Sequence, residues 1–577
     1  MKKLLIYLKN YKKETFLGPL FKLLEASFEL IIPLVVASII DVGIANGDRG
    51  YILTRVFIMI GLGAVGLTSA LTAQFFAAKA ACGFATELRH ALFVRMQELS
   101  FSEIDRVGTS GLINRMTTDV NALQGCVNMV IRLFLRSPFI VFGAMVMAFT
   151  IDVKCALIFC VAIPLLTIIV FAIMLGTIPL YRRVQASLDR VLKNTRENLT
   201  GTRVVRAFNR QIIETDNFNE DNRILKGLQI FAGKISALMN PITFVIINVA
   251  TVVLIYSGAL KVDAGALKQG QVVALVNYMS QILVELIKLA NLIIQVTRAM
   301  ASANRVQEIF DMEITMEYPE VTASGCDTEY AVEFDKVALT YQGGGDAALN
   351  NIDFKVKKGE TIGIIGGTGS GKTSLINLIP RFYDATEGEV RVNGINVKDY
   401  ARTELRDKIG VVMQKAVLFK DSIRGNMLWG RSDATDEEII AALKAAQAYD
   451  FVVDKDGGLD YMVAQGGSNL SGGQRQRLTI ARTLVKKPEI LILDDSSSAL
   501  DYATDARLRQ AIRQFDENIT TFIVSQRTAS IRNADKIVVL EDGCVAGIGT
   551  HEELLENCPV YREIYGTDSN KNTGGAK

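Results

Sequence analysis

The sequence lacks closely paired cysteines. Its seven cysteines are scattered, show no metal-ligand spacing, and in several cases lie in apolar runs, where a thiol acts as a small hydrophobic group. We therefore expect free thiols, with neither a zinc site nor a disulfide. The seven positions are Cys82, Cys126, Cys155, Cys160, Cys326, Cys544 and Cys558.

The sequence also has few histidines and no large excess of positive or negative charge. His90 and His551 are the only histidines among the 577 residues, so an imidazole is available at few positions. The 63 lysines and arginines nearly balance the 61 aspartates and glutamates, which leaves a formal net charge of +2. This balance gives no indication of a nucleic-acid partner.

Apolar residues, in contrast, are abundant. They make up 49% of the chain, and the mean hydropathy is positive, which is typical of a membrane protein with a soluble part. The pattern predicts a membrane domain at residues 1–315 and a soluble domain at residues 316–567. The polar, glycine-containing residues 568–577 predict a disordered tail.

Six apolar segments are long enough to cross a bilayer, which requires about 20 residues in a helix. They predict an all-α domain with six spans, at residues 16–40, 56–78, 127–150, 156–175, 235–260 and 272–296. Lysines and arginines are concentrated at the N-terminus and in the long connections 79–125 and 181–234, which places these segments in the cytoplasm. Because six spans return the chain to its starting side, the soluble half is also expected in the cytoplasm. We expect a multi-pass protein of the cell's inner (plasma) membrane.

Charged residues inside predicted spans need a partner or a polar cavity. Glu25 and Glu29 are four residues apart, on one face of the first span. They predict either a polar cavity that attracts cationic or amphipathic substrates, or ion pairs with neighbouring helices. The helices that carry Arg132 and Arg136 are examples of such neighbours.

A glycine-rich loop between a strand and a helix is the first chemical motif of the soluble half. Strand 361–365 leads into it, and helix 374–379 leads out. Glycines let backbone N–H groups close around phosphate oxygens, Lys372 adds charge near the β- and γ-phosphates, and the Thr373 hydroxyl is a ligand for Mg²⁺. The predicted ATP-binding residues here are Gly366, Gly367, Thr368, Gly369, Ser370, Gly371, Lys372, Thr373 and Ser374.

A second apolar strand, 490–493, ends in Asp494, whose carboxylate is placed to hold the magnesium shell. This strand and the glycine-rich loop together predict an α/β domain with the fold of P-loop nucleoside triphosphatases. ATP and Mg²⁺ are its expected ligands.

A third motif identifies the class of ATPase. The run Leu470, Ser471, Gly472, Gly473 and Gln474 opens a helix, and it resembles the signature motif of ABC ATPases. With six spans before the ATPase half, the whole chain resembles the half-transporters of the ABC exporter class, particularly the degenerate subunits of heterodimeric multidrug exporters. The resemblance implies that this run meets the γ-phosphate of a nucleotide held by a second subunit, in a head-to-tail sandwich.

The same resemblance implies roles for other residues. Tyr341 would stack on adenine, Gln414 would sense the magnesium ion and the membrane domain, and Asp501, in the run 498–501, would form the D-loop. The small-residue breaks at 107–115 and 201–208 resemble the two coupling helices of ABC exporters, which rest in grooves of the ATPase domains. The alternative for these two breaks is that they are solvated helical turns.

Two positions of the nucleotide site depart from the pattern of this family. Asp495 stands where a glutamate is usual, and Gln526 stands where a histidine is usual. The attacking water must be polarised by a carboxylate at hydrogen-bond distance, and an aspartate is shorter by one carbon–carbon bond, about 1.5 Å. We therefore expect this chain's own site to bind ATP and to hydrolyse it poorly.

The resemblance implies that an intact signature run completes the nucleotide site of another chain and not its own. The sequence therefore predicts a heterodimer with a second half-transporter that supplies the usual glutamate and histidine. Its expected function is the ATP-driven efflux of drugs or other small amphipathic substrates. The alternatives are a lipid or peptide exporter, a slow homodimer, and an ATP-gated channel or regulatory subunit. Six spans disfavour a soluble ABC protein that acts on DNA or ribosomes.

Overall fold

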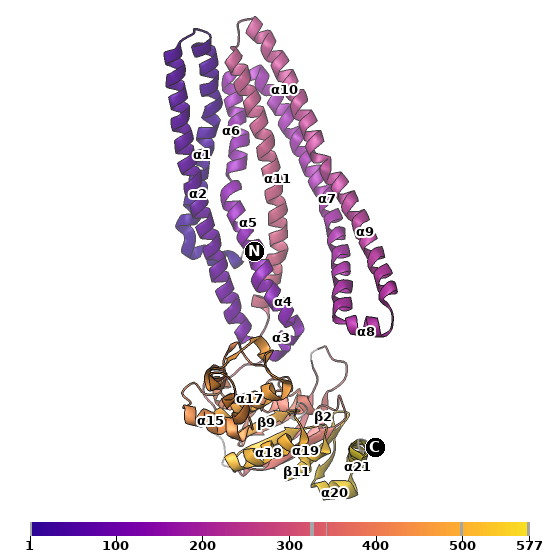
Figure 1. Cartoon of the computed structure of the whole chain (residues 1–577). Helices are drawn as coiled ribbons and strands as arrows, with labels where there is room; N and C mark the ends of the chain where they lie inside the picture. Colours follow the sequence, from indigo (N-terminus) through magenta and orange to yellow (C-terminus); the bar gives the residue numbers. More distant parts are fainter. Residues whose placement is uncertain (1–2, 324–327, 342, 497–499, 574–577) are drawn as a thin grey trace. The chain divides into compact units, whose positions relative to one another are not determined.

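The computed structural model describes residues 3–323, 328–341, 343–496 and 500–573. Within this part, the chain forms two compact units (Figure 1). The helical unit contains residues 3–97 and 109–312. The sheet unit contains residues 98–108 and the described residues from 313 onward.

The helical unit confirms the six predicted spans. Six stretches of the described residues are long and apolar enough to cross a membrane, and each contains one predicted span. These stretches are 3–44, 49–98, 109–151, 153–200, 211–263 and 269–311. The protein is therefore a multi-pass membrane protein.

The elements of the helical unit are η1 (Lys3–Tyr11), α1 (Lys12–Ser38), η2 (Ile39–Ile44), α2 (Arg49–Glu98), α4 (Thr109–Asn114), η3 (Arg115–Asp119), α5 (Val120–Leu133), α6 (Arg136–Ile151), α7 (Val153–Thr200), α8 (Thr202–Ala207), α9 (Gln211–Ala237), α10 (Met239–Asp263) and α11 (Gln269–Asp311). Prolines lie near the start of two of these helices. Pro138 and Pro241 lie in the first turns of α6 and α10, where the missing N–H of proline is tolerated. Pro33 and Pro164 instead lie inside α1 and α7.

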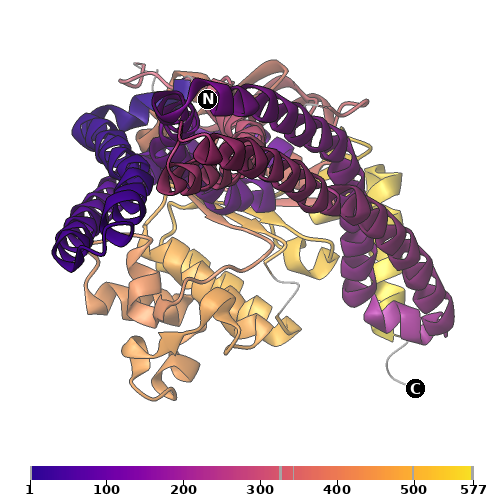
Figure 2. The same cartoon turned by 90° about the horizontal axis from the view of Figure 1, so that it is seen from above.

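The core of the helical unit lies between α1, α6, α7, α10 and α11. Small buried residues such as Ala26 and Ala144 allow these helices to approach closely. The fully buried Tyr278 of α11 donates a hydrogen bond to the Leu30 carbonyl of α1 (2.6 Å). Seen from above, the indigo pair α1–α2 and the magenta pair α7–α9 lie at opposite edges of this unit (Figure 2).

The strands of the sheet unit are β1 (Tyr330–Leu339), β2 (Leu349–Lys357), β3 (Thr361–Gly366), β4 (Glu387–Val392), β5 (Ile395–Asn396), β6 (Ile409–Val412), β7 (Asp421–Ser422), β8 (Met462–Val463), β9 (Ile490–Asp494), β10 (Thr520–Val524), β11 (Lys536–Glu541) and β12 (Cys544–Gly549). The larger sheet has the order β12-β11-β3-β10-β9-β6, and only β12 in it is antiparallel to its neighbour. An antiparallel sheet has the order β2-β1-β4-β5, and β7 pairs with β8.

The helices of the sheet unit are α3 (Phe101–Val107), α12 (Lys372–Leu378), η4 (Val397–Asp399), α13 (Arg402–Lys408), α14 (Ile423–Leu428), α15 (Asp436–Ala445), α16 (Tyr449–Val453), η5 (Gly458–Asp460), η6 (Gln465–Gly467), α17 (Gly472–Val485), α18 (Tyr502–Phe515), α19 (Thr528–Ile531), α20 (His551–Asn557) and α21 (Pro559–Thr573). Every residue of β9 and β10 is buried, as expected for parallel strands with both faces covered. Ligands of such sheets bind beyond the carboxyl ends of the strands.

Two segments differ from what the sequence suggested. The short helix that joins the sheet unit is α3, at 101–107, whereas the predicted coupling segment 107–115 is mostly α4 and η3 of the helical unit. The reason is that α3 supplies aromatic and carboxylate groups that pack against the sheet unit, a feature that a search for small-residue breaks overlooks. The predicted tail 568–577 overlaps the end of α21, and its last four residues lie outside the described part.

The six described cysteines are free, and Cys326 lies outside the described residues. Among the residues that the structure covers, no group of three or more His, Cys, Asp or Glu side chains could hold a metal ion by itself.

Candidate functional site

The carboxyl ends of three parallel strands bring the predicted nucleotide-site residues together. β3 leads into the glycine-rich loop, β9 ends at Asp494, and β10 is followed by Ser525 and Gln526. Residues from all three strand ends surround one cavity of 260 Å³. Its lining consists of Ala348, Thr368, Gly369, Ser370, Gly371, Lys372, Thr373, Ser374, Gln414, Asp494, Asp495, Val524, Ser525 and Gln526.

The glycine-rich loop is fixed at both ends by close backbone approaches. A Cβ atom at Gly366 would lie 2.2 Å from the Leu540 carbonyl oxygen. At Gly371, where φ is 93°, a Cβ would lie 2.8 Å from the Ala348 carbonyl oxygen. Only glycine fits these two positions without displacing backbone.

Lys372 lies inside the loop that precedes it. Its Nζ donates hydrogen bonds to the carbonyl oxygens of Gly366 (2.9 Å) and Gly367 (2.6 Å). Burial lowers the pKa of the Lys372 ammonium group, and the charges of Asp495 and Asp494 partly oppose this shift. An anion in the cavity would stabilise the charged form, which is what a phosphate-binding lysine requires.

Thr373 and Asp494 form a pair of oxygen ligands that fits Mg²⁺. The Thr373 Oγ1 lies 3.3 Å from each carboxylate oxygen of Asp494, and Asp494 is buried. Mg²⁺ is usually held by one or two protein oxygens together with water and substrate phosphates.

Asp495 and Gln414 meet at the edge of the cavity. The Gln414 Nε2 donates a hydrogen bond to the Asp495 Oδ2 (3.3 Å). Burial raises the pKa of the Asp495 carboxyl, and the hydrogen bond from Gln414 partly opposes the shift. The backbone of Asp495 has a φ of 45°, a left-handed conformation that aspartate tolerates better than most side chains do.

Replacing Asp494 with asparagine is expected to raise the melting temperature of the nucleotide-free protein near neutral pH. Burial, the largest cause, raises the pKa of the Asp494 carboxyl in the folded protein. The folded state therefore binds this proton more readily than the unfolded state, and the destabilisation by the charged form is complete above the folded pKa and vanishes below the unfolded pKa. Thermal unfolding measures the change.

Asp501→Asn is the matched control for this prediction. The pKa of Asp501 is lowered, chiefly by the hydrogen bond that its carboxylate accepts from the Thr504 N–H, so loss of its charge should lower the melting temperature. Adding ATP with Mg²⁺ should stabilise the wild type more than Asp494→Asn. A lower melting temperature for nucleotide-free Asp494→Asn would contradict the prediction.

Tyr341 lies beside the glycine-rich loop, two residues after β1. Its hydroxyl donates a hydrogen bond to the Ser374 Oγ (2.9 Å), which places its ring near the cavity without lining it. Stacking of this ring on adenine stays a prediction.

The signature run Leu470 to Gln474 lies apart from the cavity, since none of its residues belongs to the cavity lining. It forms the N-terminus of α17, where Ser471 and Gln474 cap the helix reciprocally. Ser471 and Gly472 are exposed to solvent. Contact of this run with a nucleotide on another chain stays a prediction.

Asp501 begins α18, and its Oδ1 accepts a hydrogen bond from the Thr504 N–H (2.9 Å). Two residues of the predicted D-loop, Ser498 and Ala499, lie outside the described residues. The described part of the run thus shows a helix cap at Asp501.

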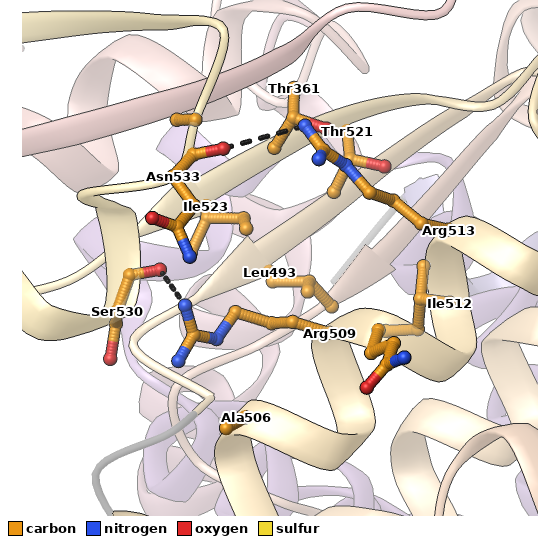
Figure 3. Close-up of a pocket in the computed structure, with 12 residues that line it drawn as sticks. Thr361, Leu493, Ala506, Arg509, Ile512, Arg513, Thr521, Ile523, Ser530 and Asn533 are labelled. Carbon is orange, nitrogen blue, oxygen red and sulfur yellow. Dashed lines mark hydrogen bonds between the residues drawn. The ribbon is translucent and has the colours of Figure 1, made fainter.

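A second pocket, of 380 Å³, lies between α18 and the segment that follows β10 (Figure 3). Arg509 donates to the Ser530 carbonyl oxygen (2.8 Å) and pairs with the buried Asp505 (3.2 Å). Asp505 also accepts from the Ser530 hydroxyl (2.9 Å). These bonds connect the helix that follows Asp501 to the segment that follows Gln526.

Sequence reasoning missed this connection. The spacing of Asp505 and Arg509, four residues apart, is a signal for an ion pair within a helix. No local signal indicates that Ser530 completes the group, because its contact depends on the packing of α19 against α18.

The membrane glutamates are paired with basic side chains. Arg136 Nη2 lies 2.6 Å from Glu29, and Arg136 Nη1 lies 2.5 Å from Glu285. Lys22 Nζ lies 2.5 Å from Glu25. The Arg136 pairs join α6 to α1 and to α11, as expected if glutamates pair with neighbouring helices, whereas Lys22 and Glu25 both belong to α1. A role for Glu25 and Glu29 in substrate binding stays a prediction, and only the Glu29 side chain, 37% exposed, is accessible enough for it.

Two family models match the chain. The model described as the ABC transporter transmembrane region matches residues 15–286, and the model described as ABC transporter matches residues 349–498.

Several proteins are similar to the chain over most of its length. An uncharacterized ABC transporter ATP-binding protein of Mycobacterium tuberculosis strain H37Rv is 34% identical, over 99% of this chain and 98% of its own. The putative multidrug export ATP-binding/permease protein of Bacillus subtilis strain 168 is 32% identical, over 98% of both chains. An ATP-dependent lipid A-core flippase of Syntrophus aciditrophicus is 30% identical, over 83% of this chain and 79% of its own.

The fold is also similar to that of a solved structure. A bacterial Atm1-family ABC exporter with ATP bound superimposes with a TM-score of 0.79, over 96% of this chain and 98% of the other. The two sequences are 23% identical, so this likeness concerns the fold.

Proposed function

This chain belongs to the ABC transporter family, as an ATP-driven membrane transporter with the exporter fold whose ATPase domain uses ATP with Mg²⁺, and from this premise we propose that it is one half of a heterodimeric exporter. Its own site holds ATP and cleaves it slowly. Its signature run, Leu470 to Gln474, completes the site of a partner half-transporter that carries the usual glutamate and histidine.

One observation gives the main support for slower ATP hydrolysis at this chain's own site than at the partner's site. Asp495 and Gln526 line the same 260 Å³ cavity as Lys372, Thr373 and Asp494. The cavity therefore has residues suited to binding phosphate and metal, but its carboxylate is about one carbon–carbon bond shorter than a glutamate. A water at the distance that suits glutamate is too far from Asp495 to lose its proton efficiently.

The signature run supports the other half of the proposal. Its exposed position at the N-terminus of α17 suits contact with a nucleotide on a second chain, because helix N-termini bind phosphate. In a homodimer, two intact signature runs would complete two weak sites. In a heterodimer, this run completes one competent site.

In this proposal, nucleotide binding draws two ATPase domains together, and the cytoplasmic connections transmit the closure to the spans. Basic residues in those connections favour a cytoplasmic ATPase domain and insertion in the plasma membrane. The substrates are lipophilic, in keeping with the names of relatives for multidrug export and lipid A-core flipping. Drugs and lipids are distinguished by which of them stimulates the ATPase activity of the assembled transporter.

Asp495→Glu should increase ATP turnover by the full chain purified without a partner. A positioned general base contributes about 10²–10⁴-fold, and because Gln526 remains, we expect a gain nearer ten-fold. Steady-state phosphate release measures it. Asp494→Glu is the matched control, because an extra methylene at the magnesium position should lower turnover rather than raise it.

Two results would contradict the heterodimer. One is brisk ATP hydrolysis by the wild-type chain as a self-paired assembly. The other is mass spectrometry of the protein that copurifies with this chain showing only the chain itself. Accumulation of substrate against a gradient, in vesicles that contain both subunits, would exclude an ATP-gated channel or a purely regulatory subunit.

A further inference from the structure

Helix α3 is part of the sheet unit, although the chain on both sides of it belongs to the helical unit. The chain leaves the helical unit after Gln97 and returns to it at Thr109. Glu103 fixes the start of α3, since its carboxylate accepts from the Ser100 N–H (2.7 Å) and from the Thr315 hydroxyl (2.7 Å). Gly108, with a φ of 74°, ends the helix. α3 is thus a segment of the sheet unit that is flanked in the sequence by residues of the helical unit.

Aromatic side chains elsewhere in the sheet unit contact α3. The ring of Phe101 packs against Phe382, with 4.6 Å between ring centroids. The Tyr383 hydroxyl donates a hydrogen bond to the Asp105 carboxylate (2.6 Å). A hydrogen bond from a neutral hydroxyl to a carboxylate belongs to the stronger class of protein hydrogen bonds.

Tyr383 also contacts the residue expected to stack on adenine. Its ring meets the ring of Tyr341 edge to face, with centroids 5.1 Å apart and an interplanar angle of 90°. Tyr341 in turn donates to Ser374 of the phosphate-binding motif (2.9 Å). One side chain therefore lies between the candidate adenine pocket and α3.

The segment that carries Tyr383 is held rigidly. It follows α12, the helix that leaves the glycine-rich loop, and the Phe382 N–H donates to the Asn377 carbonyl of that helix (2.9 Å). Arg381 forms two hydrogen bonds to Asp384, of 2.7 and 3.0 Å. Burial, and next the hydrogen bond to Asp105, raise the pKa of the Tyr383 hydroxyl, so it stays a protonated donor.

We propose that Tyr383 is a positioning residue that links occupancy of the adenine pocket at Tyr341 to the docking of α3 through Asp105. The inference rests on the proposed function, in that ATP must bind at this chain's own loop. Adenine stacked on Tyr341 restrains that ring, the restrained ring restrains Tyr383, and Tyr383 is then held in the geometry that Asp105 accepts. Because binding couplings are reciprocal, loss of the bond to Asp105 must also weaken ATP binding.

The proposed link predicts that Tyr383 affects the binding of a ligand that carries the adenine base and does not affect the binding of a ligand that carries phosphates alone. Tyr383 contacts Tyr341 but does not line the cavity around Lys372 and Thr373. A ligand with phosphates and no base should therefore bind independently of Tyr383. A merely structural role for Tyr383 would affect both kinds of ligand.

The test uses the full chain in lipid nanodiscs, titrated by calorimetry with ATP and with tripolyphosphate, each with Mg²⁺. Tyr383→Phe and Asp105→Ala should each raise the Kd for ATP by about five-fold or more, the lower end of typical coupling between sites. The double variant should lose no more than either single variant, and the Kd for tripolyphosphate should not change. Tyr400→Phe is the matched control, because its buried hydroxyl donates to the Val392 carbonyl (2.9 Å), away from α3.

Hydrogen exchange gives the reciprocal measurement. ATP should slow amide exchange in residues 98–108 of the wild type, tripolyphosphate should not, and Tyr383→Phe should remove the effect of ATP. Unchanged ATP affinity and unchanged exchange in Tyr383→Phe would refute the link alone, as would an equal loss of affinity for both ligands. Failure of the wild-type chain to bind ATP would overturn the proposed function and the link together.

Discussion

Ser471→Arg should reduce the ATPase activity of the assembled transporter by at least about 10²-fold, the usual loss when a preorganised transition-state donor is removed. Ser471 is the exposed second residue of the signature run and the N-cap of α17. In the proposed assembly it faces the γ-phosphate of the partner's competent site, and an arginine side chain would occupy that space. Asp495→Asn, which alters only this chain's weak site, should change the activity little.

The loss of a helix cap must be separated from the loss of the partner's site. Ser471 and Gln474 form a capping box, and removal of a cap costs about 1 kcal/mol of stability by itself. Thr550→Arg is the matched control, because Thr550 and Glu553 form the same kind of capping box at α20, away from the cavity. Steady-state ATPase assays on the purified complex make the comparison. Equal losses in Ser471→Arg and Asp495→Asn would refute the asymmetric assembly.

Arg136→Ala should destabilise the membrane half by about 3–5 kcal/mol, as expected when one member of a buried ion group is removed. Arg136 is buried, and it contacts Glu29 and Glu285 on two other helices. Glu285, whose side chain is 3% exposed, also accepts from Ser137 (2.8 Å) and from Lys288 (2.8 Å). Without Arg136, its carboxylate would lose its most deeply buried cationic partner.

This effect is measured by heating the protein in lipid nanodiscs and determining the fraction that remains monodisperse. Arg223→Ala is the control, because Arg223 pairs with Glu220 at the surface and its side chain is 76% exposed. The double variant Arg136→Met with Glu285→Gln should recover part of the loss, since it removes opposite charges together. If Arg136→Ala unfolds at the wild-type temperature, the ion group does not stabilise the packing of α1, α6 and α11.

The motifs of the nucleotide site were predictable because each is a short local pattern. The glycine-rich loop, Asp494 and Gln526 each lie at or just after the end of a strand of the parallel sheet, and such strands end at one edge. The cavity that they line together is a consequence of that topology. The sequence suggested the helix of Arg136 as a partner for the glutamates of the first span, but the contact of Arg136 with Glu285 was harder to predict, because these two residues are separated by 149 positions and by two further spans.

The position of α3 could not be predicted from local pattern either. The small residues at 107–115 suggested a coupling segment there. The residues of α3 that contact the rest of the sheet unit are instead aromatic and acidic, and their partners lie far along the chain. Tyr383 and Asp105 are 278 positions apart. Tyrosine and aspartate are both common on protein surfaces, so neither residue indicates a contact by itself. Only the folded structure shows that the two side chains are in contact.

The sequence by itself determined that this chain has six spans and an ATP-binding domain, and that its carboxylate at position 495 is short. Hydropathy, loop glycines and side-chain length are properties of neighbouring residues, so they can be read before folding. The tertiary structure decided which groups meet: the shared cavity of Asp495 and Gln526, the Arg136 ion group, and the contact from Tyr341 through Tyr383 to α3. These depend on packing between distant segments, which no local pattern specifies.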